Sequence, residues 1–361
     1  MKIMFCIGSM AQGGAERVIA NLSNKLSQKN EVSVVSTVVG KPFYTLKNKV
    51  KYYTLDNDNK KENIIKRTVK RIKNLRKIIK EEKPDIAVAF LPEPTFRLMI
   101  AKSFLNIKTI ISVRNDPKVL YNTFLKKMIV KIFYSSADGF VFQTEDAKKW
   151  FSNRIQSKSK IIPNPINENF ICKPFMGVRD KSIVCVARLV KQKNHKMLIN
   201  AFNKVIIKHS EYSLKLYGEG PCKESLINQV KELNLESKVI FMGEVSNIKD
   251  EIYRSGIFVL PSDYEGMPNA LMEAMALGIP CVATDCPCGG PRFLIENGKN
   301  GLLFDIGDEN GLIDSLNLLI ENEELSKNIG LHANEICYKL APSKINIEWE
   351  NYILEVTNEK K

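Results

Sequence analysis

Two glutamates eight residues apart form the clearest chemical pattern in this sequence. Glu265 follows the apolar run Ile257–Leu260, and Glu273 lies in the first turn of a helix predicted over Ala270–Leu277. Carboxylates accept hydrogen bonds, which the hydroxyls of a sugar or a ribose donate. Between them, Gly266-Met267-Pro268-Asn269 offers backbone amides to a phosphate at the helix N-terminus. Attraction to the helix dipole would explain Glu273 alone, but not Glu265 beside a glycine and a proline.

Two cations follow another predicted strand. Arg188 and Lys193 come after Ser182–Ala187. At the carboxyl end of a buried strand, such a pair would neutralise a diphosphate leaving group. A solvated basic turn is the alternative, and these residues alone favour it.

Paired glycines mark the loop after the first apolar run. Gly13 and Gly14 precede a helix predicted over Ala15–Leu26. They would let the backbone approach a ligand near the positive end of the helix. The spacing does not match the G-x-G-x-x-G fingerprint, so a plain tight turn is an equal alternative.

Three other groups are not expected to act in chemistry. Asp56-Asn57-Asp58 matches a D-x-D metal motif, but its Asn/Lys-rich surroundings predict a surface turn. The three histidines are too few and too separated for a metal site, and His195 is predicted to be structural. The eight cysteines lie scattered in apolar runs, which indicates reduced thiols in a cytosolic protein. No metal site is predicted.

Short β-rich runs alternate with helical patterns along the whole chain. The predicted strands are Ile3–Ile7, Val32–Ser36, Ile86–Phe90, Thr109–Val113, Gly139–Phe142, Ser182–Ala187, Leu214–Tyr217, Val239–Phe241, Ile257–Leu260 and Pro280–Thr284. This alternation predicts parallel sheets covered by helices on both faces, with ligands at the carboxyl ends of the strands. A restart near residue 175 predicts an α/β protein with two Rossmann-like domains, 1–170 and 175–340, facing a central cleft.

Charge is distributed unevenly over the 361 residues. Residues 1–170 carry 32 Lys and Arg against 14 Asp and Glu, whereas residues 171–361 carry 22 against 26. The first half is therefore suited to an anionic partner: a nucleic acid, a membrane surface or a phosphorylated acceptor. No apolar run approaches the length of a membrane span, and the start does not resemble a signal peptide.

The basic residues concentrate in one predicted helix. Residues 60–83 contain eleven Lys and Arg against three Glu. An apolar stripe recurs at three- or four-residue steps and is predicted to pack on the sheet; it consists of Ile65, Val69, Ile72, Leu75 and Ile79. The cations are predicted to hold the protein peripherally at the cytoplasmic face of an anionic membrane.

Taken together, these loops resemble family 4 of the retaining glycosyltransferases, which have the GT-B fold. The matching segments are Gly13-Gly14-Ala15-Glu16-Arg17, Arg188 with Lys193-Asn194, Tyr217-Gly218-Glu219-Gly220-Pro221, Phe241-Met242-Gly243, Pro261-Ser262 with Glu265-Gly266 and Glu273-Ala274-Met275, Gly278-Ile279-Pro280, and Gly298 with Asn300-Gly301-Leu302. The resemblance implies that Arg188, Lys193 and Glu265 are catalytic, with Glu265 on the donor sugar. It implies donor binding by Gly13, Gly14, Gly218, Gly243, Val245, Gly266, Met267, Pro268, Asn269 and Glu273.

The resemblance also implies a reaction. A hexose or N-acetylhexosamine would pass from a nucleotide sugar, with UDP as the expected nucleotide, to a saccharide acceptor. That acceptor is expected on a lipid such as a polyprenyl diphosphate, in cell-surface polysaccharide or glycolipid synthesis. Neither a metal, nor a cofactor, nor a protein nucleophile is expected.

Two further regions follow from the resemblance. Arg114 and Asn115 stand where many family members have a histidine that reaches the donor sugar. Arg114 either replaces that histidine or, with Asn115, serves the acceptor side. The C-terminal segment 343–361, with Trp349 and Tyr352, is expected to cross back onto the first domain.

Two other classes of function remain open. A sugar-nucleotide epimerase of the same architecture would need more acid/base histidines than this sequence has. A nucleic-acid binder using the basic half would leave Glu265 and Glu273 unexplained and lacks aromatic residues among its cations. No nucleic-acid partner is therefore expected.

Overall fold

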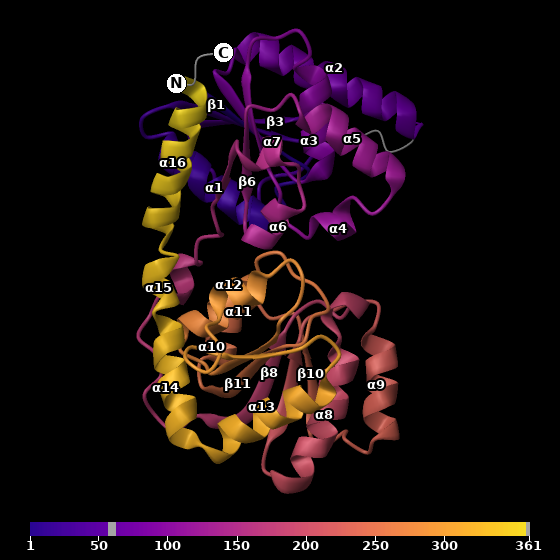
Figure 1. Ribbon diagram of the computed structural model, residues 1–361, viewed down its shortest axis with the longest axis vertical. Coiled ribbons are helices and arrows are strands. Elements are labelled where there is room, and N and C mark those ends of the chain that lie inside the picture. The colour runs from indigo at the N-terminus through magenta and orange to yellow at the C-terminus, as the bar shows by residue number, and fades with distance from the viewer. Residues whose placement is uncertain (57–62, 359–361) are drawn as a thin grey trace. The chain divides into compact units, whose positions relative to one another are not determined.

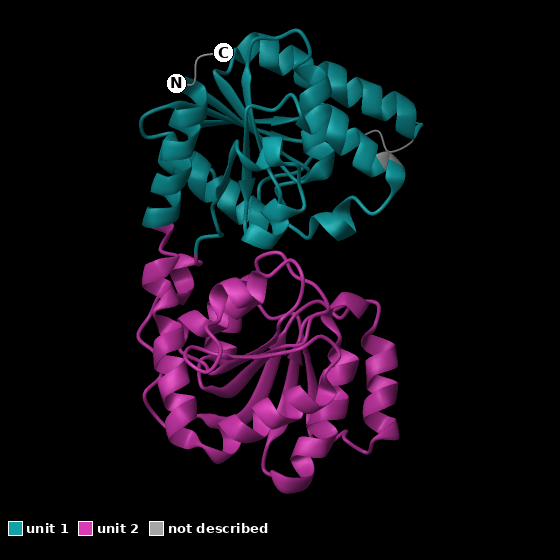
Figure 2. Ribbon diagram, viewed as in Figure 1, with its two compact units in different colours: residues 1–165, 343–361 teal, residues 166–342 magenta. Residues whose placement is uncertain are grey.

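The chain is divided into two compact units, each built around one parallel sheet. The computed structural model describes residues 1–56 and 63–358, apart from the side chain of Leu125. Unit 1 comprises Met1–Pro165 and Ser343–Lys361, and unit 2 comprises Ile166–Pro342 (Figure 2). Within the described residues, no helix combines the length and the apolar character needed to cross a bilayer.

Unit 1 contains a seven-stranded parallel sheet in the order β3-β2-β1-β4-β5-β6-β7 (Figure 1). Its strands are β1 (Lys2–Ile7), β2 (Glu31–Ser36), β3 (Val50–Thr54), β4 (Ile86–Phe90), β5 (Lys108–Ser112), β6 (Gly139–Phe142) and β7 (Ser159–Ile161). All five residues of β4 are fully buried. Such continuous apolar strands are expected where helices cover both faces of a parallel sheet.

The helices of unit 1 follow or connect these strands, apart from the C-terminal helix, which returns to this unit from unit 2. They are α1 (Gly14–Leu26), α2 (Ile64–Glu82), α3 (Pro92–Ala101), α4 (Pro117–Leu120), α5 (Phe124–Tyr134), α6 (Glu145–Lys149), α7 (Asn153–Gln156) and α16 (Pro342–Asn358). Polar side chains begin several of them: Asn63 caps α2, Asp116 caps α4 and Thr144 caps α6. Each cap accepts a hydrogen bond from a backbone amide that the first turn leaves unpaired.

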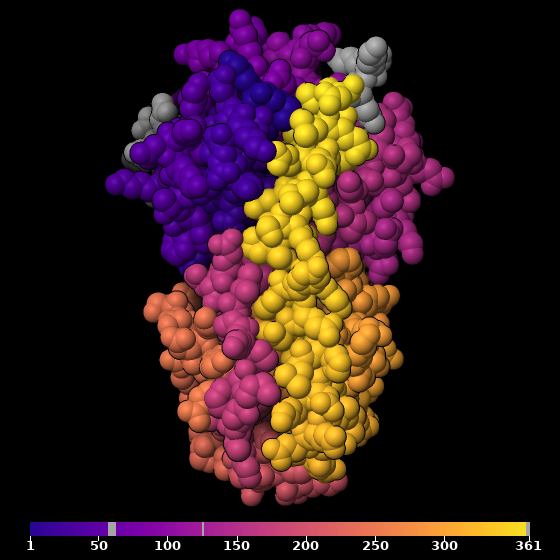
Figure 3. Space-filling view, turned by 90° about the vertical axis from the view of Figure 1, so that its left-hand side faces the viewer, coloured from indigo at the N-terminus to yellow at the C-terminus, as the bar shows by residue number. Residues whose placement is uncertain are grey.

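The C-terminal helix α16 belongs to unit 1 from Ser343 onward, although it is far in sequence from the rest of that unit. Trp349 is fully buried and stacks on Phe90, with 5.6 Å between ring centroids. The Tyr352 hydroxyl donates to the Lys158 carbonyl at 2.7 Å and accepts from the Phe140 amide at 2.9 Å. Figure 3 shows the helix, in yellow, on the surface of this unit.

Unit 2 repeats the topology with a six-stranded parallel sheet in the order β10-β9-β8-β11-β12-β13. Its strands are β8 (Asp180–Val186), β9 (Ser213–Tyr217), β10 (Val239–Gly243), β11 (Ser255–Leu260), β12 (Cys281–Thr284) and β13 (Leu302–Phe304). Its helices are η1 (Glu168–Phe170), η2 (Lys191–Lys193), α8 (His195–Lys208), α9 (Lys223–Glu232), α10 (Ile248–Ile252), α11 (Asn269–Ala276), α12 (Gly290–Leu294), α13 (Glu309–Glu321), α14 (Glu323–Asn334) and α15 (Ile336–Lys339).

The predicted fold class, two Rossmann-like α/β units, is confirmed, and every predicted strand is present. The sequence interpretation missed β3, β7 and β13. The strands β7 and β13 have three residues each, too few to show a periodicity, and the three missed strands lie at the sheet edges. In each sheet the strand order reverses at one point, between β1 and β4 and between β8 and β11, where ligands of this fold class bind.

The prediction that the whole apolar stripe of α2 packs on the sheet is wrong. Leu75 and Ile79 are buried, but Ile65 is 73% exposed and Val69 is 46% exposed. The core cluster that receives Leu75 and Ile79 includes Leu98 and Ala101 of α3. No residue of the first two turns of α2 belongs to that cluster, so the apolar side chains there face outward.

Candidate active site

In unit 2, the loops that leave β8 and β11 are bonded to one another. The Gln192 carbonyl accepts from the Asp263 amide at 2.9 Å, and the Gln192 side chain donates to the Tyr264 carbonyl at 2.7 Å. Asn194, which caps α8 from a left-handed backbone conformation, donates to the Asp263 carboxylate at 3.0 Å. These bonds hold the two predicted loops together at the switch point of the sheet.

Glu265 and Lys193 form an ion pair within these loops. The Glu265 residue is 7% exposed, and its Oε1 accepts from the Lys193 ammonium and, at 2.7 Å, from the Ser262 hydroxyl. Two backbone bonds to the β12 loop fix Glu265 further: its amide donates to the Pro287 carbonyl at 2.8 Å, and its carbonyl accepts from the Cys288 amide at 3.1 Å. The carboxylate is therefore held in one position.

Arg188 lies at the carboxyl end of β8, close in sequence to Lys193 but in a different environment. Arg188 is exposed, and among the described residues its guanidinium has no hydrogen bond or ion pair. Lys193, by contrast, is largely buried against Glu265. The structure thus places one exposed, unpaired cation and one paired cation at the ends of the same loop, a combination that can accommodate an anionic group.

Glycines allow the neighbouring loops to approach closely. Gly218 has φ of +130°, and a Cβ there would lie 2.2 Å from the Ala187 carbonyl oxygen. Its amide donates to the Gly243 carbonyl at 2.8 Å, and Val245 is half-buried two residues further on. The residues predicted to surround the base therefore lie at or just after the carboxyl ends of β9 and β10, and Gly218 lies against the start of the β8 loop.

The segment leading into α11 presents backbone amides. Gly266, Met267 and Pro268 are buried, and Asn269 is the first helical residue. In the part of the chain that the structure describes, the Gly266 and Met267 amides have no hydrogen-bond acceptor. Buried amides of this kind at a helix N-terminus suit a phosphate oxygen.

The predicted position of Glu273 requires a correction. The helix begins at Asn269, so Glu273 is its fifth residue and lies outside the first turn, which contains no acidic residue. Pro268 is the N-cap with an extended backbone (ψ of 100°), so the helix begins one residue earlier than predicted. Glu273 is half-buried on the helix that begins at the Glu265 loop.

In unit 1, the paired glycines lie where the sequence predicts. Gly14 begins α1 and Gly13 precedes it with φ of −178°, an extended conformation open to any residue. Glu16 lies in the first turn of α1, and burial raises the pKa of its carboxyl group. This loop follows β1, at the switch point of its own sheet.

Arg114 is enclosed by aromatic and amide side chains of unit 1. Its guanidinium carbon lies 4.5 Å from the centre of the Phe90 ring and 5.4 Å from that of Trp349. Nη1 donates to the Asn164 Oδ1 at 2.9 Å, whereas Nε and Nη2 are buried without a partner in the described chain. Burial lowers the pKa of Arg114 to about 9, so it remains charged at neutral pH. The adjacent Asn115 is half-buried and accepts from the Asp116 amide.

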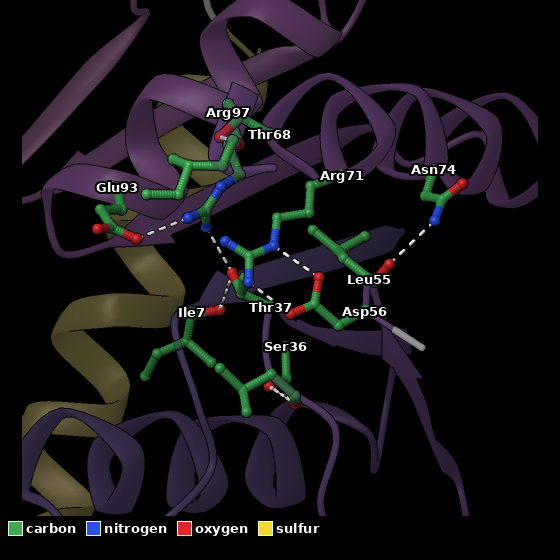
Figure 4. A network of polar contacts seen from close by, with 12 residues as sticks. Ile7, Ser36, Thr37, Leu55, Asp56, Thr68, Arg71, Asn74, Glu93 and Arg97 are labelled. Carbon is green, nitrogen blue, oxygen red and sulfur yellow. Dashed lines mark hydrogen bonds and ion pairs between the residues drawn. The ribbon is translucent and has the colours of Figure 1, made fainter. Parts of the chain in front are cut away.

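The D-x-D segment is only partly a surface turn. Asp56 is largely buried, and its carboxylate accepts two hydrogen bonds from the Arg71 guanidinium. Arg71 Nε donates to Asp56 Oδ1 at 2.6 Å, and Nη2 donates to Oδ2. Arg71 lowers the pKa of Asp56. Figure 4 shows this pair beside Arg97, which donates to Thr37 and Glu93 at 2.6 Å each. The surface-turn prediction is therefore wrong for Asp56, because an arginine from α2 covers it. Asn57 and Asp58 lie outside the described residues.

Sequence reasoning missed several residues that position the site. Ser262 bonds to Glu265, and Gln192, Asn194 and Asp263 join the two loops. Ser262 could have been noticed because it follows a strand three residues before the glutamate. The contacts of Gln192 and Asp263 join segments about 70 residues apart, and nothing in either segment alone indicates them.

Comparisons with known proteins agree with this arrangement. A family model described as glycosyl transferases group 1 matches residues 171–335, and one described as glycosyltransferase family 4 matches residues 12–170. The chain belongs to the family 4 glycosyltransferases and is a glycosyltransferase.

Two relatives come from Campylobacter jejuni. The first, 29% identical over 99% of this chain and 99% of its own length, is a GalNAc-alpha-(1->4)-GalNAc-alpha-(1->3)-diNAcBac-PP-undecaprenol alpha-1,4-N-acetyl-D-galactosaminyltransferase. The second, 30% identical over 90% of this chain and 92% of its own, is an N-acetylgalactosamine-N,N'-diacetylbacillosaminyl-diphospho-undecaprenol 4-alpha-N-acetylgalactosaminyltransferase. Both names describe transfer to a lipid-linked saccharide.

Solved structures show the same fold. HepE from Anabaena, crystallised with UDP, has a TM-score of 0.83 at 18% identity, over 98% of this chain and 100% of that one. The lipopolysaccharide outer core galactosyltransferase WaaB has a TM-score of 0.79 at 22% identity, over 98% and 99% of the two chains. These likenesses establish the GT-B type of fold.

Proposed function

We propose that this glycosyltransferase moves a hexose or N-acetylhexosamine from a UDP-sugar to a lipid-linked saccharide, with retention of anomeric configuration and without a metal ion. The observation that carries the proposal is the buried Glu265, held by Ser262 and Lys193 on a loop bonded to the one that bears Arg188. The Campylobacter relatives with undecaprenol-linked acceptors support the acceptor class, and HepE with bound UDP supports the nucleotide.

Each group has a defined part in this proposal. Arg188 and Lys193 neutralise the charge that develops on the departing diphosphate, the largest electrostatic demand of the reaction. The Gly266 and Met267 amides bind a phosphate oxygen, Glu265 accepts from the donor sugar hydroxyls, and Glu273 accepts from the ribose. Gly218 and Gly243 leave space beside the base.

The bond changes need no protein nucleophile. The acceptor hydroxyl oxygen forms a bond to the anomeric carbon on the face from which the diphosphate departs. The bond between that carbon and the diphosphate oxygen breaks, and the hydroxyl proton passes to the departing diphosphate. Because the new bond forms on the same face, the configuration is retained.

Donor binding is tested first. UDP should raise the thermal midpoint more than GDP, CDP or dTDP, since a ligand at a hundred times its dissociation constant adds about 2.7 kcal/mol of stability. Arg188→Gln should reduce this shift, whereas Arg154→Gln, an exposed arginine of unit 1, should not. A larger shift with GDP would contradict the uridine assignment.

Turnover then tests the metal and the stereochemistry. UDP release from UDP-GalNAc, UDP-GlcNAc, UDP-galactose and UDP-glucose should continue in excess EDTA, because cations of the chain balance the diphosphate. Loss of activity in EDTA and its recovery with Mn²⁺ would refute the metal-free mechanism. With undecaprenyl-diphosphate-linked GalNAc as acceptor, the new linkage should be α by NMR; a β product would refute retention.

A further inference from the structure

Helix α5 carries an apolar stripe that nothing in the described chain covers. Phe124 is 79% exposed, Met128 42% and Ile132 59%. At spacings of four residues they share one face of the helix, while Val130 and Tyr134 on another face are buried. Lys126, Lys127 and Lys131 are exposed on the same helix. The helix therefore has an apolar face bordered by cations.

The start of α2 has the same composition. Ile64 and Ile65 are each 73% exposed and Val69 is 46% exposed, with the exposed Lys66 between them. Both α2 and α5 contact α3, and in Figure 1 both extend their N-terminal ends toward the same side of unit 1. We define the α2–α5 face as Ile64, Ile65, Val69, Phe124, Met128 and Ile132 with Lys66, Lys126, Lys127 and Lys131.

We propose that the α2–α5 face docks on an anionic lipid bilayer. The apolar side chains enter the region between headgroups and acyl chains, and the lysines remain at the phosphates, as in amphipathic helices that lie in a membrane interface. The surplus of positive charge in residues 1–170 attracts the same surface. This differs from attraction by charge alone, because the exposed apolar groups must contribute.

The composition of this face argues against protein partners. Lysine is depleted in protein–protein interfaces, whereas here four lysines border six apolar residues. A second copy on the same face would bring lysines against lysines. An anionic bilayer satisfies both the apolar and the cationic part.

The inference rests on the proposed function for its purpose, since a lipid-linked acceptor lies in a membrane, but bilayer binding itself requires no donor. The protein should sediment with phosphatidylcholine vesicles containing 30% phosphatidylglycerol, and binding should weaken with salt. Lys126→Gln, Lys127→Gln and Lys131→Gln together should weaken binding about a hundredfold, at about 1 kcal/mol for each lost cation. Phe124→Ser, Met128→Ser and Ile132→Ser together should weaken it at least tenfold at unchanged net charge.

Matched variants on unit 2 provide the control. Val178→Ser, Ile207→Ser and Ile306→Ser remove exposed apolar side chains of similar exposure and should leave binding unchanged. The emission of Phe124→Trp should shift to shorter wavelength on anionic vesicles, whereas that of Val178→Trp should not. Equal binding of the stripe variant and the wild type would overturn the proposal, as would equal binding to neutral vesicles. The proposal would also be overturned if the protein formed a dimer in the absence of vesicles and the triple serine variant of Phe124, Met128 and Ile132 alone were monomeric.

UDP-sugar hydrolysis separates the two proposals. Intact hydrolysis with no vesicle binding refutes the α2–α5 face alone. Vesicle binding without hydrolysis of any UDP-sugar refutes the proposed donor alone.

Discussion

Glu265 of unit 2 and Arg114 of unit 1, each at the end of a strand, differ in how their charged groups are satisfied. In unit 2, Glu265 bonds to Lys193 and Ser262, and Asp263 bonds to Asn194. In unit 1, Arg114 is half-buried, and its Nε and Nη2 atoms are buried and unpaired in the described chain, with no carboxylate of that chain beside the guanidinium. An unpaired buried polar group reduces stability by roughly 1–3 kcal/mol. The carboxylates of the unit 2 loops are therefore held by neighbouring side chains, whereas the unpaired nitrogens of Arg114 lower the stability of unit 1.

Cation–π contacts offset part of this loss of stability. Arg114 lies over Phe90 and near Trp349, and such contacts contribute on the order of 0.5–2 kcal/mol. Trp349 comes from α16 and Asn164 lies directly before the end of the first segment of unit 1. Arg114 thus connects the two segments of chain that make up this unit.

The largest expected effect follows from removing the fixed charge of unit 2. Glu265→Gln should lower turnover about 10- to 150-fold, because a hydrogen bond to a charged group contributes about 1.5–3 kcal/mol. Steady-state kinetics with the best UDP-sugar measure this, and Glu236→Gln, an exposed glutamate of the same unit, serves as control. Wild-type turnover in a folded Glu265→Gln would remove Glu265 from the site.

The second prediction concerns the backbone beneath this charge. A Cβ on Gly290 would lie 1.7 Å from the Gly266 carbonyl oxygen, so Gly290→Ala must displace the loop that carries Glu265. It should destabilise unit 2 by roughly 1–3 kcal/mol and weaken UDP binding. Calorimetry and a UDP titration test this. Gly8→Ala, where a Cβ meets nothing within 4 Å, should leave the midpoint unchanged. A Gly290→Ala variant with the thermal midpoint and UDP affinity of the wild type would show that the Gly290 and Gly266 loops are not in contact.

A matched pair of substitutions tests the comparison itself. Lys193→Met leaves the buried Glu265 with Ser262 alone and should destabilise unit 2 by about 1–3 kcal/mol. Arg114→Met removes a buried charge without leaving an unpaired partner carboxylate, so unit 1 should stay within about 1 kcal/mol of the wild type or exceed it. Hydrogen exchange resolved by unit measures both. Strong destabilisation by Arg114→Met would show that Arg114 is structural, and the contrast between the units would fail.

Much of this contrast was not accessible from sequence. The strands, the two Rossmann-like units and the glutamate-bearing loop are local patterns of apolar runs, glycines and prolines. The bonds of Gln192 to Tyr264 and of Arg71 to Asp56 depend on which strand ends and helices become neighbours, as set by the strand order. The exposure of Ile65 also depends on tertiary packing. Periodicity identifies the apolar face of α2, but it does not show how far along that face the packing partners extend.

The smallest effect concerns His195, the exception within unit 2. It begins α8 directly after the β8 loop, is buried, and has both ring nitrogens unpaired in the described chain. Burial, and secondarily the nearby Lys193, lower its pKa to about 4 from an ordinary value of 6.5. Below pH 6.5 the imidazole of His195 therefore binds a proton in the unfolded chain, whereas in the folded chain it binds one only near pH 4 and below. Stability should be independent of this group above pH 6.5 and fall on acidification, by about 1.4 kcal/mol at pH 5.5. His195→Met should flatten this acid limb in thermal melts of unit 2, whereas His332→Met, an exposed histidine on α14, should leave it as it is. If the thermal midpoint of His195→Met fell with pH just as it does in the wild type, other groups would cause the fall. The folded protein would then tolerate a protonated His195 as well as a neutral one.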